Sequence, residues 1–206
     1  MMNVDADGLA AKLRKQISGE VRFDHGSRAL YATDGSNYRQ TPIGVVIPKT
    51  KEDVIATVGL CREFGAPITS RGCGTSLAGQ CCNVAVIIDF TKYMHNVLEL
   101  DPDKKLAWVQ PGCVCDTLRD AAEEHGLTWG PDPATHMWCT LGGMLGNNSC
   151  GVHSEMSGRT SDNVHALRVL TYDGEEMLVS RTPDLESIIQ KGGRRGEIYG
   201  GLKKLA

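Results

Sequence analysis

The first half of the chain alternates between helical and strand-like patterns of apolar residues. Two segments repeat apolar side chains at helical spacing, and the second begins after Thr50, which has an acidic residue three positions later, as in a helix N-cap. Three short apolar runs are typical of buried strands. The expected helices are 7–17 and 51–64, and the expected strands are 44–48, 66–70 and 84–89, so that 44–70 form a β-α-β unit.

The second half of the chain has hairpin signals instead. Turn residues separate short apolar runs at two places, and a helix is expected between the two hairpins. The elements are strands 97–100 and 106–109, a helix over 115–125, a loop over 130–139, a short helix over 140–146, strands 164–170 and 176–180, and a possible final helix in 183–206. The fold class is therefore α+β with two lobes. We expect an N-terminal helical extension over 1–24, lobe one over about 25–90 and lobe two over about 91–206.

Composition excludes several classes of partner. The chain has 206 residues, of which 41% are hydrophobic and 23% charged, as in ordinary globular proteins. Its net charge is −3, so no basic surface for nucleic acid is expected. No apolar run approaches the roughly 18 residues that a membrane helix needs, and Met1 to Arg14 lack a signal-peptide core.

Eight cysteines raise the question of a metal site or disulfides. None of them forms a C-x-x-C motif, and the Cys81-Cys82 and Cys113-x-Cys115 spacings are poor for zinc. We therefore expect no metal ligation, free thiols and a cytoplasmic protein.

A glycine-rich loop follows the expected strand 66–70. Gly72 and Gly74 allow a tight turn and close approach of a ligand, and successive N–H groups in such a turn can bind an anion. Thr75 and Ser76 add hydroxyl donors, and Arg71 adds a positive charge. The loop is therefore a candidate phosphate site, and a simple tight turn between two strands is the alternative.

Two common phosphate motifs do not fit this loop. A P-loop requires a lysine after its second glycine, and no lysine follows a glycine here. A dinucleotide fingerprint requires a third glycine where Leu77 stands, and the next apolar run, 84–88, begins only eight residues after Ser76, too soon for a crossover helix. Asp89 only imitates the ribose-binding acid of that fingerprint.

A second glycine cluster lies about 70 residues further on. Gly142 and Gly143 stand in an apolar helical context, where each glycine costs about 1 kcal/mol, so a close approach of something large is indicated. Asn147, Asn148 and Ser149 follow with uncharged hydrogen-bonding groups. Together with a phosphate loop, this surface fits a flat heteroaromatic cofactor with a diphosphate. The alternative is tight helix–strand packing beside an Asn-rich turn.

Six segments, in this order, resemble the PCMH-type FAD-binding domain of the vanillyl-alcohol oxidase superfamily. They are YATD (31–34), GVVIPKTKEDV (44–54), ITSRGCGTSLAGQ (68–80), PGCVCDTLRDAAEEHGL (111–127), PDPAT (131–135) and TLGGMLGNNSCGVHSEMSGRTSDNV (140–164). The greatest similarity is to the branch of FAD-linked D-lactate, D-2-hydroxyglutarate and glycolate dehydrogenases. The resemblance covers about residues 25–180.

The resemblance implies FAD as cofactor. In the family, the loop matching 71–76 wraps the pyrophosphate with backbone N–H groups, and segments matching 132–138, 140–143 and 147–150 line the flavin and its ribityl-phosphate arm. Thr75 stands where several relatives have a flavin-linking histidine, so non-covalent FAD is implied, and no bond to Cys73 or Cys139 is expected. The implied cofactor-binding residues are Arg71, Gly72, Cys73, Gly74, Thr75, Ser76, Gln80, Pro131, Asp132, Thr140, Gly142, Gly143, Asn147, Asn148, Ser149 and Gly151.

The family's later segments have no match in the chain. A Gly-Thr-Leu-Gly-like segment and the substrate-binding cap are not found, so a fragment of a longer enzyme is expected, inactive alone. Analogy with long relatives of similar GGMLGNNSCG sequence implies an iron–sulfur domain in the full-length chain. The implied reaction is oxidation of a small 2-hydroxy acid by hydride transfer to flavin, with neither catalytic base nor electron acceptor identified. Alternatives are a non-catalytic flavin- or nucleotide-binding module and the FAD domain of a UDP-sugar reductase; a metal-dependent electron carrier ranks last.

Overall fold

The computed structural model describes residues 4–181 and 184–205 and divides the chain into two compact units. The first extends to Asn163 and the second begins at Val164. The expected extension and the expected lobe boundary near residue 90 stay predictions; both fall within the first unit, where the helix and strand in residues 4–24 pack on and pair with the sheet.

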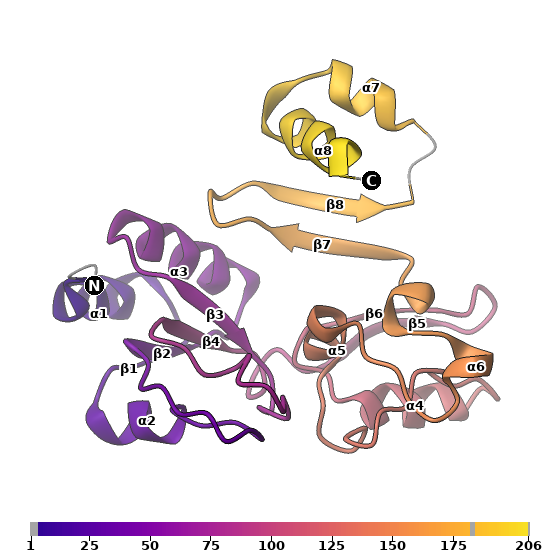
Figure 1. Cartoon of the computed structure of the whole chain (residues 1–206), viewed down its shortest axis with the longest axis horizontal. Coiled ribbons are helices and arrows are strands. Elements are labelled where there is room, and N and C mark those ends of the chain that lie inside the picture. The colour runs from indigo at the N-terminus through magenta and orange to yellow at the C-terminus, as the bar shows by residue number, and fades with distance from the viewer. Residues whose placement is uncertain (1–3, 182–183, 206) are drawn as a thin grey trace. The chain divides into compact units, whose positions relative to one another are not determined.

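The first unit begins with a four-stranded sheet of order β1-β2-β4-β3 (Figure 1). Its edge strand β1 is antiparallel to β2, and β2 and β3 are each parallel to β4. The β-α-β unit is confirmed, but β4 lies between its two strands. All four residues of β4 are buried, whereas β3 is polar and partly exposed, so β4 occupies the centre. The strands are β1 (Glu20–Arg22), β2 (Gly44–Ile47), β3 (Ile68–Arg71) and β4 (Val86–Asp89).

Helices cover both faces of this sheet (Figure 1). The main core joins α1 (Ala6–Gln16) and α3 (Lys51–Glu63) to one face, through fully buried side chains such as Leu9, Leu13 and Val46. On the other face, Tyr31 at the end of α2 (His25–Leu30) packs with Val45 and Ile87. The sheet is therefore buried on both sides, as parallel sheets generally are.

The N-cap expected at Thr50 is confirmed and fixes the start of α3. The Thr50 hydroxyl oxygen accepts a hydrogen bond from the Asp53 N–H at 3.2 Å. The buried Asp53 carboxylate in turn accepts from the N–H groups of Ser18 at 2.8 Å and Lys49 at 2.9 Å. Although burial opposes it, these hydrogen bonds lower the pKa of Asp53.

The rest of the first unit packs helices against a hairpin. Its core contains Cys113, Cys115, Leu118, Cys139, Leu141 and Met144, with Val97, Leu100, Val109 and Trp129 against them. The expected hairpin, helix and short helix are all confirmed. The elements are β5 (Val97–Asp101), β6 (Leu106–Val109), α4 (Cys115–Glu123), α5 (Leu141–Asn147), α6 (Ser154–Ser157) and a 3₁₀ turn at Thr160–Asn163.

The second unit is a hairpin followed by two helices. β7 (Ala166–Leu170) pairs antiparallel with β8 (Glu176–Ser180), as expected. α7 (Leu185–Gln190) then packs on α8 (Gly193–Leu205), which is the expected final helix. No helix in the described parts of the chain is long and apolar enough to span a bilayer.

Candidate functional site

The glycine-rich loop leaves the carboxyl end of β3, as predicted. Within the described residues, the five backbone N–H groups of 72–76 donate no hydrogen bond to the chain. Gly74 has φ +72°, a conformation that other residues rarely adopt. A run of free N–H groups around a left-handed glycine is the arrangement that binds phosphate oxygens.

Arg71 has a different place from the one expected. Its guanidinium donates to three backbone carbonyls, those of Thr33 at 2.8 Å, Tyr31 at 3.3 Å and Cys81 at 3.4 Å. It also lies 5.3 Å from the centre of the Tyr31 ring. The sequence suggested that this guanidinium binds phosphate. In the structure its hydrogen bonds connect both ends of the glycine-rich loop to the segment after α2.

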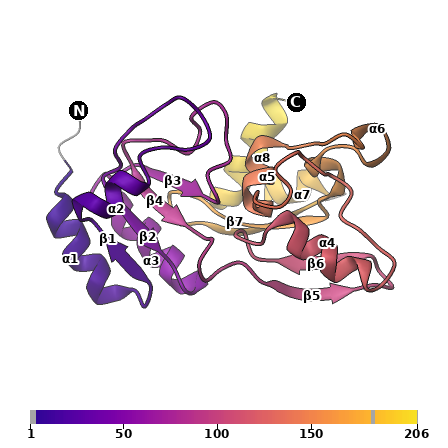
Figure 2. The ribbon, with the colours of Figure 1, turned by 90° about the horizontal axis from the view of Figure 1, so that it is seen from below.

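That segment, residues 33–38, was missed as part of the site. Figure 2 shows it beside the loop that follows β3. The Gly35 N–H donates to the Gly74 carbonyl at 2.8 Å, and a Cβ at Gly35 would lie 3.1 Å from the Ser76 carbonyl oxygen. Asp34 accepts hydrogen bonds from the N–H groups of Ser36 at 2.9 Å and Cys81 at 3.3 Å. The only sequence signal was the Tyr31–Asp34 match to the family.

The two glycine clusters meet at Gly72 and Thr140. A Cβ on Gly72 would lie 2.2 Å from the Thr140 hydroxyl oxygen, far inside contact distance. Thr140 is the N-cap of α5, and its hydroxyl oxygen accepts from the Gly143 N–H at 3.3 Å. Gly72 therefore has to be glycine for the loop and the start of α5 to touch.

The N–H groups of residues 141–144, at the start of α5, all donate hydrogen bonds. Leu141 donates to the Cys113 carbonyl at 2.8 Å, Gly142 to the Pro111 carbonyl at 2.9 Å, and Met144 to the Thr140 carbonyl at 2.8 Å. A Cβ on Gly142 would lie 2.8 Å from the same Pro111 oxygen, so packing explains this glycine. Among the described residues, the N–H groups without a partner are therefore those of the loop and not those at the start of this helix.

The outer face of α5 is small and open. Gly143, Gly146 and Asn147 are exposed and stand at i, i+3 and i+4, on one side of the helix. A Cβ at Gly146 would meet nothing within 4 Å, and one at Gly143 would meet only the Thr140 hydroxyl, at 3.3 Å. Such a face allows a flat ring to approach the helix backbone.

The next two predicted residues close the helix. Asn148 has φ +48°, and its side-chain oxygen accepts from the Ser161 N–H at 3.0 Å. Ser149 donates its N–H to the Met144 carbonyl at 2.9 Å, and its own carbonyl accepts from the Thr160 hydroxyl at 2.7 Å. These hydrogen bonds therefore stabilise the end of α5, as expected for the Asn-rich turn that the sequence allowed as the alternative to a cofactor site.

Asp132 is held by the segment that follows α5. The His153 ring Nδ1 lies 2.5 Å from one carboxylate oxygen, and the His153 N–H donates to the other at 3.3 Å. This hydrogen bond from His153 lowers the pKa of Asp132. A Cβ on Gly151 would lie 2.0 Å from the Asp132 carbonyl oxygen, so Gly151 is required by this packing. His153 was not among the predicted site residues.

The remaining predicted side chains lie around the glycine-rich loop and Asp132. Gln80 accepts from the Ala78 N–H at 3.1 Å, and the Ser76 hydroxyl lies 3.2 Å from the Cys81 sulfur. Cys73 is exposed, and burial of part of its side chain, with Asp89 nearby, raises its pKa. The carbonyl of Pro131 lies 3.7 Å from the Cys115 sulfur. Asp89 accepts from the Tyr31 hydroxyl at 2.5 Å and from the Thr91 N–H at 2.8 Å, which supports its exclusion as a ribose ligand.

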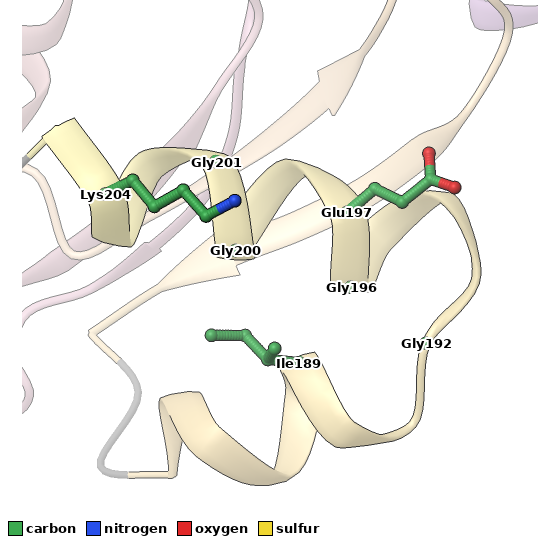
Figure 3. A pocket seen from close by; sticks show the side chains of 7 residues that line it. All are labelled: Ile189, Gly192, Gly196, Glu197, Gly200, Gly201 and Lys204. Atoms are coloured by element: carbon green, nitrogen blue, oxygen red, sulfur yellow. The ribbon is translucent and has the colours of Figure 1, made fainter.

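A separate cavity of about 480 Å³ lies in the second unit, between α7 and α8 (Figure 3). The Ile189 side chain of α7 faces the glycines of α8, and a Cβ on Gly196 would lie 3.1 Å from the Ile189 carbonyl oxygen. None of the predicted site residues is among those lining the cavity, which are Ile189, Gly192, Gly196, Glu197, Gly200, Gly201 and Lys204. The glycines allow α7 and α8 to pack closely. The predicted site residues all lie in the first unit.

The site's geometry agrees with a family match. The protein-family model described as "FAD binding domain" matches residues 42–180, more than half of the chain. The chain belongs to this family. The match includes both glycine clusters, and FAD is the cofactor that the free N–H groups of 72–76 and the open face of α5 fit.

Curated relatives of this FAD-binding domain are much longer proteins. The chain is 33% identical to D-2-hydroxyglutarate dehydrogenase of Pseudomonas putida, over 93% of the chain and 20% of that protein. It is 32% identical to the glycolate oxidase subunit GlcD of Escherichia coli, over 85% of the chain and 36% of the subunit. A D-lactate dehydrogenase of Anaerostipes hadrus is 31% identical over 84% of the chain and 35% of that protein.

Solved structures confirm the expected fold. An alkyldihydroxyacetonephosphate synthase superposes with a TM-score of 0.75 at 23% identity, over 85% of this chain and 38% of its own. The 6-hydroxy-D-nicotine oxidase of Arthrobacter nicotinovorans superposes with a TM-score of 0.70 at 24% identity, over 82% of this chain and 38% of its own. At this identity the likeness concerns the fold alone.

Proposed function

We propose that the FAD-binding domain holds the FAD pyrophosphate on residues 72–76 and the flavin with its ribityl arm along α5 and the 131–133 segment. The observation behind this proposal is the contact of Gly72 with Thr140, which makes a row of free N–H groups continuous with the open face of α5. Asp132, held by His153, is a fixed acceptor in the 131–133 segment. FAD bound in this way is non-covalent, as Thr75 suggests.

We further propose that the whole protein oxidises a small 2-hydroxy acid. The relatives named D-2-hydroxyglutarate dehydrogenase, glycolate oxidase subunit and D-lactate dehydrogenase support this substrate class over a UDP-sugar. The flavin supplies the hydride acceptor when bound, and the residues of this chain bind and orient it. The electron acceptor, an iron–sulfur domain and a cytoplasmic location stay predictions.

The cofactor proposal is tested by adding FAD to the purified chain and recording its visible spectrum, before and after acid precipitation. Bound flavin with yellow colour released into the supernatant is the expected result. Colour retained in the pellet would contradict the non-covalent assignment. A chain that stays folded but does not bind FAD would contradict the site for this length of chain, and the same titration on the longer protein would show whether further segments are required.

Two pairs of variants locate the site. Gly74→Ala should lower FAD affinity more than Gly65→Ala, although both replace a glycine with positive φ, +72° and +64°. Gly143→Val should lower it more than Gly59→Val, since both positions are helical but only Gly143 lies in the proposed site; a Cβ at Gly59 meets nothing within 4 Å, and one at Gly143 meets only the Thr140 hydroxyl, at 3.3 Å. Equal affinities within each pair, in folded variants, would exclude the proposed placement of FAD.

A further inference from the structure

Cys115 and Cys139 face each other across a short antiparallel contact. Val114 and Thr140 form a β-bridge, with Cys115 donating its N–H to the Cys139 carbonyl at 2.9 Å and Leu141 donating to the Cys113 carbonyl at 2.8 Å. In this register Cys115 and Cys139 are opposite one another, on the same side of the pair. Directly opposed residues have Cα atoms about 4.5–5.5 Å apart, within the range that a disulfide requires.

The two thiols also contact one another. The Cys115 sulfur donates a hydrogen bond to the Pro131 carbonyl at 3.7 Å, and the Cys115 and Thr135 side chains both influence the pKa of Cys139. The interaction between the two thiols lowers the pKa of Cys139 against the opposing effect of burial, and the same interaction together with burial raises the pKa of Cys115. Of the two cysteines, Cys139 is therefore the one that loses its proton more readily.

The exposure of the two side chains also favours Cys139 over Cys115 as the first to react with an oxidant. Cys115 is fully buried, whereas Cys139 keeps 6% of its surface exposed and follows Trp138, which is 63% exposed. A small neutral oxidant therefore reaches Cys139 first. The nearby His136 adds to the thiolate's stabilisation, and its ring Nδ1 lies 2.7 Å from the Asp116 carboxylate.

The other cysteines of the first unit lack this arrangement. Cys113 is fully buried in the same cluster, but its sulfur lies 3.6 Å from the Val114 carbonyl oxygen, and burial raises its pKa to about 11. Cys61 is buried in the other core, where burial raises its pKa to about 12. Cys73 is exposed, and its pKa is raised in part by the charge of Cys139, so it is the main competitor as partner of Cys139.

We propose that Cys115 and Cys139 are a redox modification site that forms a reversible disulfide with hydrogen peroxide. The Cys139 thiolate attacks one peroxide oxygen, the O–O bond breaks, and the other oxygen leaves as water after taking up a proton. The resulting Cys139 sulfenic acid is attacked by the Cys115 sulfur; the S–O bond breaks, and hydroxide leaves with the Cys115 proton as a second water. Two thiols are oxidised, one peroxide is reduced, and a dithiol reductant reverses the change.

The disulfide would close the loop between the starts of α4 and α5. Cys139 directly precedes Thr140, the N-cap of α5 that meets Gly72. Closing this loop restricts the unfolded chain, so the oxidised protein should have a higher Tm than the reduced protein. This inference does not depend on the proposed function, because it concerns thiols that are present with or without FAD.

The test treats the full chain with stoichiometric hydrogen peroxide, blocks remaining thiols and maps tryptic peptides by mass spectrometry without reduction. We expect a mass loss of about 2 Da before blocking and a crosslink between peptides 106–119 and 120–159, reversed by dithiothreitol. The first peptide contains Cys113 and Cys115, and the second contains Cys139 and Cys150. Peptide 72–92 contains Cys73, so a crosslink to it is distinguishable.

Four variants assign the bond. Cys115→Ala and Cys139→Ala should each remove the crosslink, whereas Cys113→Ala, a matched buried thiol in the same cluster, and Cys150→Ala should retain it. Circular dichroism first establishes that each variant is folded, and fragment spectra of the wild-type crosslink identify the bonded pair even if a variant does not fold. A crosslink through Cys73, Cys113 or Cys150, or oxidation of Cys139 without any crosslink, would overturn the proposal.

Discussion

Replacing Gly72 by alanine tests the contact that joins the two glycine clusters. The new Cβ would lie 2.2 Å from the Thr140 hydroxyl oxygen and 3.0 Å from the Thr140 Cγ2, where ordinary contacts begin at 3.4 Å. Gly72 is not among the glycines with positive φ, so steric contact and not backbone strain dominates the cost. The backbone of Thr140 is fixed by the Val114 bridge and by the Met144 N–H at 2.8 Å, so the Thr140 side chain has to move.

The size of the effect follows from what that movement breaks. Rotating Thr140 removes the α5 N-cap, which costs about 1 kcal/mol. Thr140 is only 2% exposed in the wild type. Its buried hydroxyl would also lose its N–H partner, at a further cost of about 1–2 kcal/mol. We therefore expect Gly72→Ala to lower the free energy of unfolding by about 2–3 kcal/mol. In a Thr140→Ala background the cap is already lost and the nearest Thr140 atom, Cβ, lies at 3.1 Å. There the same change should cost less than about 1 kcal/mol.

The assay is urea unfolding of the wild type, both single variants and the double variant, followed by tryptophan fluorescence. All three tryptophans lie in the first unit, so the signal reports the unit that contains the contact. The expected coupling between the two sites is about 1–2 kcal/mol. If Gly72→Ala costs the same in both backgrounds, within about 0.5 kcal/mol, the reasoning from this contact is refuted.

Three further predictions concern stability. Gly59→Ala should raise the free energy of unfolding by about 0.5–1 kcal/mol, because a Cβ in this helix meets nothing within 4 Å; urea unfolding would show a decrease if the site were strained. Asp53→Ala should lower it by about 1.5–3 kcal/mol through loss of the carboxylate that binds Ser18 and Lys49, and an unchanged midpoint would contradict that role. Glu20, whose pKa is lowered from 4.5 to about 2 by hydrogen bonds from Lys92, Tyr93 and Arg22, stabilises the fold above pH 4.5 and loses this contribution as the pH falls towards 2. Urea unfolding at several pH values should therefore show a smaller acid loss in Glu20→Gln, and parallel curves would argue against it.

Periodicity predicted the long elements well, because they bury apolar stripes that the sequence displays directly. The helix from Lys51 and the strand at 86–89 are of this kind. Sheet order could not be derived, since nothing local states that β4 enters between β2 and β3; only its continuous apolar character indicates a central place. β1 has three residues and α2 six, too few to display a period.

The candidate site was predicted as a set of segments, but several individual roles were not. A glycine in a sequence can indicate that another group comes close, but it does not identify that group. The contacts of Gly142 with Pro111 and of Gly151 with Asp132 are therefore seen only in the structure. His153 lies within the family-matched segment 140–164 but was given no role, since a single histidine in a polar loop does not indicate its partner. The pairing of Cys115 with Cys139 depends on a bridge between residues 114 and 140 that sequence spacing does not encode.

The position of Arg71 has a consequence for how quickly and tightly the loop takes up its cofactor. Its guanidinium holds the carbonyls of Tyr31, Thr33 and Cys81, so the loop keeps its shape by internal hydrogen bonds alone. A preorganised loop loses little conformational entropy when a pyrophosphate arrives, so more of the interaction energy remains as affinity. Lysine would keep the charge but not the planar fork that bonds to three carbonyls. An Arg71→Lys loop would therefore have to become ordered during binding, and FAD would associate more slowly and dissociate more readily.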